Sequence, residues 1–284
     1  MSGVRREYLR LQLPGMPEGT VHHTHYRKAG SGPPLVLLHP SPMSSAFMQP
    51  LIELLQDQAT IYALDTPGYG QSDALPQAAE DLRPYVDWLA AVLLGLGLDS
   101  AGIHGSATGA QIAIQFARAH PDQTDFVVLE NAVHFTDEER DDIMRNYFPD
   151  IEPQENGSHL QLAWSMGSGL FQQFPWYDRR EENRISNAPP PVALVHATAL
   201  AYLNAGEDYA RAYKAAFNNE DARNMQALTP PTRVIRWEGS ILKRYADRLD
   251  EYEWPENIRM VHAGPTVEDR YAVLKTNLRD LLDR

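Results

Sequence analysis

The sequence predicts an α/β protein with a doubly wound, mostly parallel sheet of eight strands and a helical cap insertion. Two observations carry this prediction. Continuous apolar runs such as Leu35 to Leu38 and Ile61 to Leu64 are typical of strands that are covered on both faces. These runs also alternate with helical patterns along the chain, which favours right-handed β–α–β units.

The first half of the chain carries the clearest element patterns. Two short strands surround the Pro14-Gly15 turn, and each later apolar strand is followed by an amphipathic helix. The expected strands cover residues 6–13, 19–28, 35–38, 61–64, 101–105 and 126–129, and the expected helices cover about 51–55, 79–96 and 109–119.

The alternation stops after residue 132. The following segment is polar at its start, aromatic in its middle and helical in pattern over 193–217, so we interpret residues 133–226 as a helical cap. Strands resume at 232–237 and 258–261, before a last amphipathic helix with apolar residues at Tyr271, Leu274, Leu278 and Leu281. The predicted core therefore consists of residues 1–132 and 227–284.

Composition excludes several classes of protein. The 284 residues include 38 acidic and 25 basic side chains, and the net charge of −13 would repel a nucleic-acid backbone. No apolar run approaches the ~18 residues that a membrane span needs. The absence of cysteine excludes disulfides and a cysteine nucleophile and fits a reducing cytoplasm. We expect a cytoplasmic protein with a small-molecule substrate and no nucleic-acid or membrane partner, and a homodimer is left open.

No cofactor or metal is expected. The chain has no glycine-rich phosphate loop of the Walker or dinucleotide-binding spacing. The cluster His22, His23 and His25 falls on a strand, where alternation places His23 on the opposite face from the other two.

Three motifs at strand ends carry chemical information: His39-Pro-Ser-Pro42, Asp65-Thr-Pro-Gly-Tyr-Gly-Gln-Ser-Asp73 and Gly105-Ser-Ala-Thr-Gly109. They resemble the His-Gly-x-Pro, Asp-x-Pro-Gly-x-Gly-x-Ser and Gly-x-Ser-x-Gly motifs of the α/β-hydrolase superfamily. The resemblance covers nearly the whole chain outside the cap. It implies the α/β-hydrolase fold and a hydrolase.

The resemblance places Ala107 at the position of the family's nucleophile. A methyl group cannot attack a carbonyl carbon, so no acyl-enzyme can form at this residue. Ser106 lies one residue before the apex of the turn, and we expect it in the pocket wall, not as the nucleophile. The backbone N–H groups of Ser41 and Thr108 are expected to form the oxyanion hole.

The resemblance also suggests a general base and an acid that orients it. The family places a His just after the last strand, and among the ten histidines His262 falls there. No Asp follows the strand 232–237, whereas some branches of the family carry the acid at the end of the sixth strand, where this chain has Glu130. We expect Glu130 to orient His262, with Glu238 as the alternative.

The cap supplies an aromatic surface that includes Phe171 and Phe174. Because a cap over the strand ends commonly closes an apolar pocket with a few polar anchors, we expect a compact, largely apolar substrate. The expected substrate-binding residues are His39, Ser106, His159, Trp164, Trp176 and Tyr177.

Three hypotheses for function follow. The main one is hydrolysis of a small, largely apolar ester, lactone or carbon–carbon bond substrate, in a form whose nucleophile is replaced by Ala107, as an engineered Ser→Ala change would produce. The second is a natural lyase, isomerase or cofactor-free oxygenase that uses His262 as general base and needs no nucleophile. The third is a non-catalytic ligand-binding protein.

Overall fold

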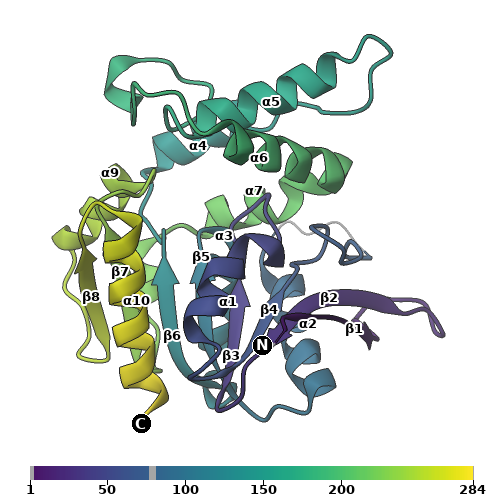
Figure 1. Ribbon diagram of the computed structural model, residues 1–284, viewed down its shortest axis with the longest axis vertical. Coiled ribbons are helices and arrows are strands. Elements are labelled where there is room, and N and C mark those ends of the chain that lie inside the picture. The colour runs from purple at the N-terminus through teal and green to yellow at the C-terminus, as the bar shows by residue number, and fades with distance from the viewer. Residues whose placement is uncertain (1–2, 77–80, 284) are drawn as a thin grey trace.

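The computed structural model describes residues 3–76 and 81–283. Within these residues a single sheet of eight strands runs through the molecule in the order β1-β2-β4-β3-β5-β6-β7-β8 (Figure 1). The strands are β1 (Arg5–Leu11), β2 (His22–Ala29), β3 (Pro34–Leu38), β4 (Thr60–Leu64), β5 (Ala101–Ser106), β6 (Thr124–Glu130), β7 (Thr232–Trp237) and β8 (Ile258–Ala263).

The sheet is mostly parallel, as the sequence predicts. β1 pairs antiparallel with β2, β2 pairs antiparallel with β4, and the strands from β4 to β8 are parallel to their neighbours. Residues Leu35 to Leu38 of β3 have no exposed surface, because helices cover both faces of this central strand. The carboxyl ends of β3, β5, β6 and β7 therefore meet at one edge of the sheet.

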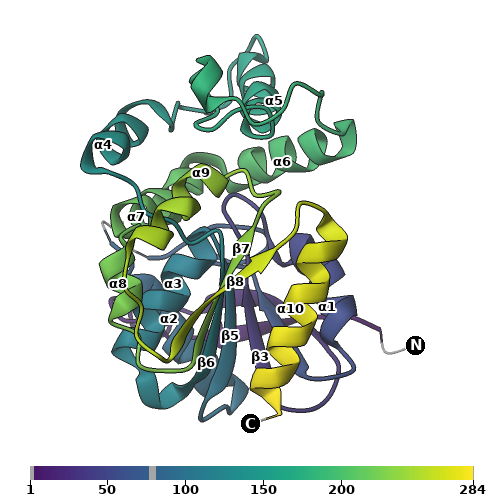
Figure 2. The same cartoon turned by 90° about the vertical axis from the view of Figure 1, so that its left-hand side faces the viewer.

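Helices cover both faces of the sheet, with α2 and α3 on one side and α1 and α10 on the other (Figure 2). The helices are α1 (Gln49–Leu55), α2 (Arg83–Leu96), α3 (Thr108–Ala119), α4 (Asp137–Asn146), α5 (Ser158–Leu170), α6 (Val192–Ala205), α7 (Arg211–Asn219), α8 (Ala222–Gln226), α9 (Lys243–Ala246) and α10 (Val267–Leu282). Short 3₁₀ turns occupy Ser45–Met48, Pro121–Gln123, Glu181–Asn183, Gly206–Ala210 and Asp247–Glu251.

Two expected helices differ from the observed ones. The helix expected over 79–96 begins at Arg83, and residues 79 and 80 lie outside the described residues. The helical pattern over 193–217 is divided between α6 and α7, because Gly206 adopts a positive φ of 58° and ends α6.

The segment 133–226 contributes to two layers. α4, α5 and α6 lie beyond the strand ends, as a cap (Figure 1). Ala212 and Ala215 of α7 and Met225 of α8 instead join the apolar cluster around α3, while Tyr213 and Phe217 on the other side of α7 pack with the cap. α7 thus has one face against the core and one against the cap. No helix among the described residues has the length and apolar character needed to cross a bilayer.

Candidate active site

The turn from β5 into α3 has the geometry of a nucleophile elbow. Ala107 adopts φ 49° and ψ −113°, a conformation that L-residues rarely enter. Its N–H donates to the Glu130 carbonyl at 3.0 Å, and its carbonyl accepts from the Gln111 N–H at 3.0 Å. A Cβ on Gly105 would lie 2.3 Å from the Gly109 carbonyl oxygen, so Gly105 is required for the close approach of β5 and α3. A Cβ on Gly109 would lie 2.3 Å from the Leu38 carbonyl oxygen, so Gly109 is required for the close approach of α3 and β3.

A cavity of about 170 Å³ lies directly above Ala107. The core lines it at the strand ends, the cap closes it with apolar side chains, and the two predicted oxyanion residues, Ser41 and Thr108, both lie in its wall. The full lining is Pro40, Ser41, Met43, Phe47, Ser106, Ala107, Thr108, Asn131, Leu170, Phe171, Phe174, Tyr213, Ala216, Phe217, Glu220, Trp237, Ile241, Leu242 and Arg270.

The backbone N–H groups of Ser41 and Thr108 have no hydrogen-bond partner among the described residues. Thr108 is the first residue of α3, where an N–H has no partner within the helix and the helix dipole favours negative charge. The two groups are therefore available to a ligand oxygen in the cavity.

Glu130 forms a buried ion pair with Arg270 of α10. The Arg270 Nε and Nη2 atoms donate to the two carboxylate oxygens at 2.5 and 2.8 Å, and the His104 ring contributes a further hydrogen bond of 2.9 Å. Burial opposes ionisation of Glu130, but the Arg270 charge and these hydrogen bonds outweigh it and lower the pKa of Glu130 to about 2. Glu130 is thus a carboxylate that is already fully partnered.

His262 does not reach the cavity. It was expected just after the last strand, whereas it lies within β8, next to Arg236 of β7, and its side chain is exposed. The residues that follow β8 are Gly264 and Pro265, neither of which can act as a base. Among the described residues, no imidazole lines the cavity.

Neither Glu130 nor Glu238 makes the expected contact with His262. Glu130 contacts Arg270 and His104, and no polar contact joins it to His262. Glu238, the alternative acid, is an exposed residue whose N–H bonds the Ala263 carbonyl. The position of these groups gives no support to a His–carboxylate pair above Ala107.

Two of the expected pocket residues lie close to the elbow but differ in their access to the cavity. Ser106 lines the cavity, and its hydroxyl accepts a hydrogen bond of 3.0 Å from Asn131, which in turn accepts from Ser240. His39 is buried beneath the wall, where its Nε2 accepts from the Thr66 N–H and burial lowers its pKa. His39 is therefore a neutral residue that holds a loop.

The cap aromatics divide between two places. Phe171 and Phe174 line the cavity above Ala107. Trp164, Trp176 and Tyr177 instead surround a separate, more polar cleft of the cap. His159 lies at a third site, where its Nδ1 accepts from the Gln154 N–H. These last four residues were expected in the substrate pocket and do not line it.

Glu220 and Arg270 are pocket residues that the sequence analysis did not single out. Arg270 could have been sought from the sequence, because a carboxylate that ends an apolar strand requires a cation when it is buried. Glu220 gave no such signal, since it follows an amphipathic helix in a segment with many acidic residues. In the part of the chain that the structure describes, no three His, Asp or Glu side chains come together as a metal site would require.

Two curated relatives are hydrolases. The chain is 33% identical over 110 residues to (E)-2-((N-methylformamido)methylene)succinate hydrolase of Acinetobacter baylyi, a match that covers 39% of this chain and 41% of that protein. It is 28% identical over 171 residues to 2-(acetamidomethylene)succinate hydrolase of Mesorhizobium japonicum, covering 60% of this chain and 55% of that protein. The chain thus spans about half the length of the curated relatives it matches.

Solved structures share the fold over almost the whole chain. The enol-lactonase from Burkholderia xenovorans superposes with a TM-score of 0.69 at 19% identity, covering 97% of this chain and 100% of that chain. A family model described as alpha/beta hydrolase fold matches residues 33–228, which is more than half of the sequence. This chain therefore belongs to the alpha/beta hydrolase fold family.

Proposed function

We propose that this chain hydrolyses a small, largely apolar ester or lactone by direct attack of water, with no covalent intermediate on a side chain. One observation carries the proposal. At the apex of an otherwise complete elbow stands the methyl group of Ala107, and no imidazole lines the cavity above it among the described residues.

The missing imidazole favours this mechanism over a serine hydrolase that has lost only its nucleophile. A serine at position 107 would need a base within hydrogen-bond reach to remove its proton. His262 is exposed on β8, and Glu130 is held by Arg270. Restoring the hydroxyl alone would therefore leave the nucleophile without a base.

Catalysis without a nucleophile rests on stabilising the negative charge that develops on the carbonyl oxygen. The free N–H groups of Ser41 and Thr108 border the cavity, and removing one donor of this kind costs roughly 10²–10³ in rate in enzymes that use them.

The cavity sets the size and polarity of the substrate. An apolar cavity of roughly 150 Å³ holds benzene, so about 170 Å³ accommodates a ligand with one six-membered ring. Leu170, Phe171 and Phe174 supply apolar surface on the cap side. The named hydrolases among the relatives support hydrolysis, while the apolar wall favours a neutral substrate.

The proposal is tested by comparing the chain with its Ala107→Ser variant on p-nitrophenyl acetate and δ-valerolactone. We expect the unaltered chain to turn over at least one of them with no burst of p-nitrophenol, and intact-mass analysis to find no adduct with a serine-directed phosphonate on either protein. A burst or an adduct in the unaltered chain would overturn the proposal, because both require a nucleophilic side chain.

Two other outcomes would replace the proposal by a named alternative. Turnover and labelling in Ala107→Ser alone would identify a hydrolase disabled by loss of its serine. Binding of both compounds, measured by calorimetry, with no turnover in either protein would identify a ligand-binding protein.

A further inference from the structure

Glu220 is a buried carboxyl group in the wall of the cavity that holds Ala107. It follows the last residue of α7, and only 4% of its surface is exposed. The Arg140 guanidinium of α4 holds the backbone at this point, by donating to the carbonyl oxygens of Phe217 and Glu220. The side chain is therefore carried on a fixed section of backbone.

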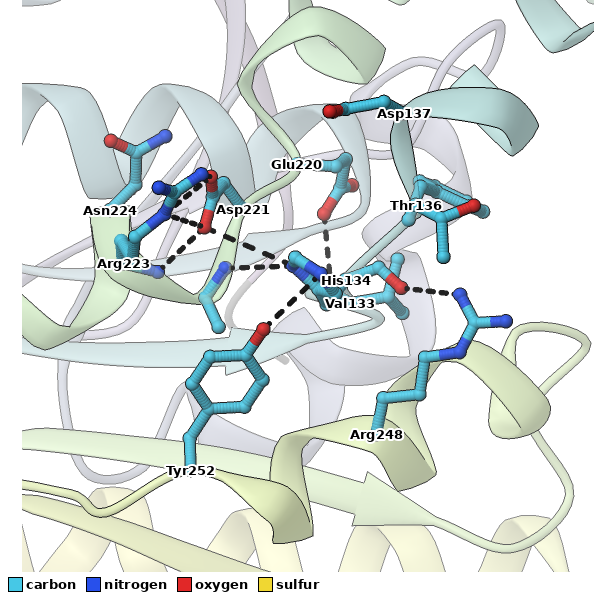
Figure 3. A network of polar contacts seen from close by, with 12 residues as sticks. Val133, His134, Thr136, Asp137, Glu220, Asp221, Arg223, Asn224, Arg248 and Tyr252 are labelled. Atoms are coloured by element: carbon cyan, nitrogen blue, oxygen red, sulfur yellow. Dashed lines mark hydrogen bonds and ion pairs between the residues drawn. The ribbon is translucent and has the colours of Figure 1, made fainter. Parts of the chain in front are cut away.

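The two oxygens of the Glu220 carboxyl group have different surroundings. Oε2 accepts from the Gln111 Nε2 at 2.6 Å and from the Val133 N–H at 3.1 Å, the second of which Figure 3 shows. Oε1 has no partner among the described residues and is open to the cavity. The carboxyl group thus presents one oxygen to the protein and one to a ligand.

Neighbouring amides fix the donor that faces Oε2. The Gln111 Oε1 atom accepts from the Asn219 amide at 2.7 Å, so the Gln111 amide nitrogen must point at Glu220. Gln115 and Asn224 donate to the Asn219 oxygen and hold that amide in turn. Because both contacts of Oε2 are donors, a proton on this carboxyl group belongs on Oε1.

Among the described residues, no ion pair with Glu220 compensates a negative charge on its side chain. Gln111 and the Val133 N–H are neutral, and Arg140 reaches only the backbone carbonyl. The neighbouring charged side chains form ion pairs with other residues. Asp221 pairs with Arg223 and faces His134 (Figure 3), and Arg270, which also lines the cavity, pairs with Glu130.

Burial without a charged partner favours the neutral form of a carboxyl group. Desolvation raises the pKa of Glu220 well above its usual range, and the Val133 N–H and Arg140 oppose this only in part. Burial therefore favours the form of Glu220 in which Oε1 carries a proton and donates toward the cavity.

We propose that Glu220 is the general acid of this site, donating its Oε1 proton to the leaving oxygen of an ester or lactone bound above Ala107. This inference deepens and rests on the proposed function. It assigns a proton to the departing group, which the two N–H donors of the oxyanion hole cannot supply.

The step balances without any further reactant. Water adds to the carbonyl carbon and forms a C–O bond, and the Ser41 and Thr108 N–H groups bind the resulting oxyanion. The bond from carbon to the leaving oxygen then breaks, and that oxygen takes the proton from Glu220. The carboxylate recovers a proton from the added water, so one ester and one water yield one acid and one alcohol.

The test uses Glu220→Gln, with Glu251→Gln as the matched control for loss of a carboxylate at an exposed position. Glutamine keeps an acceptor for Gln111 and Val133 and places an amide N–H toward the cavity, so ligand binding is retained but no proton is transferred. We expect kcat on δ-valerolactone, whose alkoxide leaving group is strongly basic, to fall by about 10²-fold or more, with KM unchanged and the control at full activity.

A second measurement reads the proton directly and does not depend on turnover. At pH 7 the infrared difference spectrum of the unaltered chain minus Glu220→Gln should contain the C=O stretch of a protonated carboxyl group. Binding of cyclohexanone should shift this band to lower frequency, because Oε1–H then donates to the ketone.

These readouts separate failure of this inference from failure of the proposed function. Turnover that survives Glu220→Gln, or the absence of a protonated carboxyl band at pH 7, would overturn the role of Glu220 and leave water attack intact. A band that shifts with cyclohexanone in a protein with no turnover would refute the hydrolytic function and keep Glu220 as the donor to a bound carbonyl. A band that does not respond to cyclohexanone would overturn the inference.

Discussion

Replacing Arg270 with methionine removes the guanidinium that forms two hydrogen bonds with Glu130. The side chain of Glu130 is 2% exposed and that of Arg270 is 15% exposed, so water cannot take over these contacts. Methionine fills a similar volume but leaves the carboxylate buried with only its His104 contact. The variant should therefore lose stability at neutral pH.

Two independent arguments give the size of the loss. A fall in the pKa of Glu130 from 4.5 to about 2 corresponds to about 3 kcal/mol of stability at neutral pH, at about 1.4 kcal/mol per unit. Breaking a buried ion pair by removing one partner costs roughly 3–5 kcal/mol. We expect Arg270→Met to lower the free energy of unfolding by about 3 kcal/mol at pH 7.

The contribution of Glu130 to the free energy of unfolding should decrease as the pH falls. Because the folded pKa of Glu130 lies below the unfolded value, its contribution is fully present above pH 4.5 and is lost as the pH falls toward 2. The unaltered chain should therefore lose stability across this window. Arg270→Met should lose less across it, since its Glu130 no longer has a strongly depressed pKa.

Urea unfolding followed by circular dichroism measures this effect, provided that the slope with denaturant stays constant. Arg180→Met removes a surface ion pair with Asp178 and is the matched control. Its urea midpoint should barely differ from that of the unaltered chain. The double variant Glu130→Gln, Arg270→Met should recover much of the loss, because no charge is then left buried. A loss below about 1 kcal/mol, or a double variant no more stable than the single one, would refute the reasoning.

Three further predictions concern the elbow and Glu220. Ala107→Gly should raise the free energy of unfolding by about 1 kcal/mol in the same assay, because glycine adopts φ 49° without strain. Gly109→Ala should sharply lower stability or soluble yield, since its Cβ would lie 2.3 Å from the Leu38 carbonyl oxygen, whereas Gly3→Ala meets no atom within 4 Å. Glu220→Gln should gain stability relative to the unaltered chain as the pH rises above 4.5. The pKa of Glu220 is higher in the folded than in the unfolded chain, so the unaltered protein loses folding free energy as the pH rises, and the glutamine variant does not. A difference in stability that stays constant between pH 4 and 8 would contradict this.

The fold was predictable from the sequence because its signals are local. Runs such as Leu35 to Leu38 are apolar on both faces, and Gly105 is required because β5 lies against the start of the following helix, α3. These features depend on residues close together in the chain. The eight strands, their mostly parallel arrangement and the position of Ala107 at the elbow follow from them.

The composition of the cavity wall was decided only by tertiary structure. Whether Glu130 meets His262 or Arg270 depends on how the last strand and α10 pack in the fold, and the observed partner is Arg270, 140 residues away in the chain. Glu220 meets Gln111 across 109 residues. Charge and hydrogen bonding act through space, so a sequence pattern specifies which elements form, while their packing determines which side chains share a low-dielectric cavity and which protonation states they keep there.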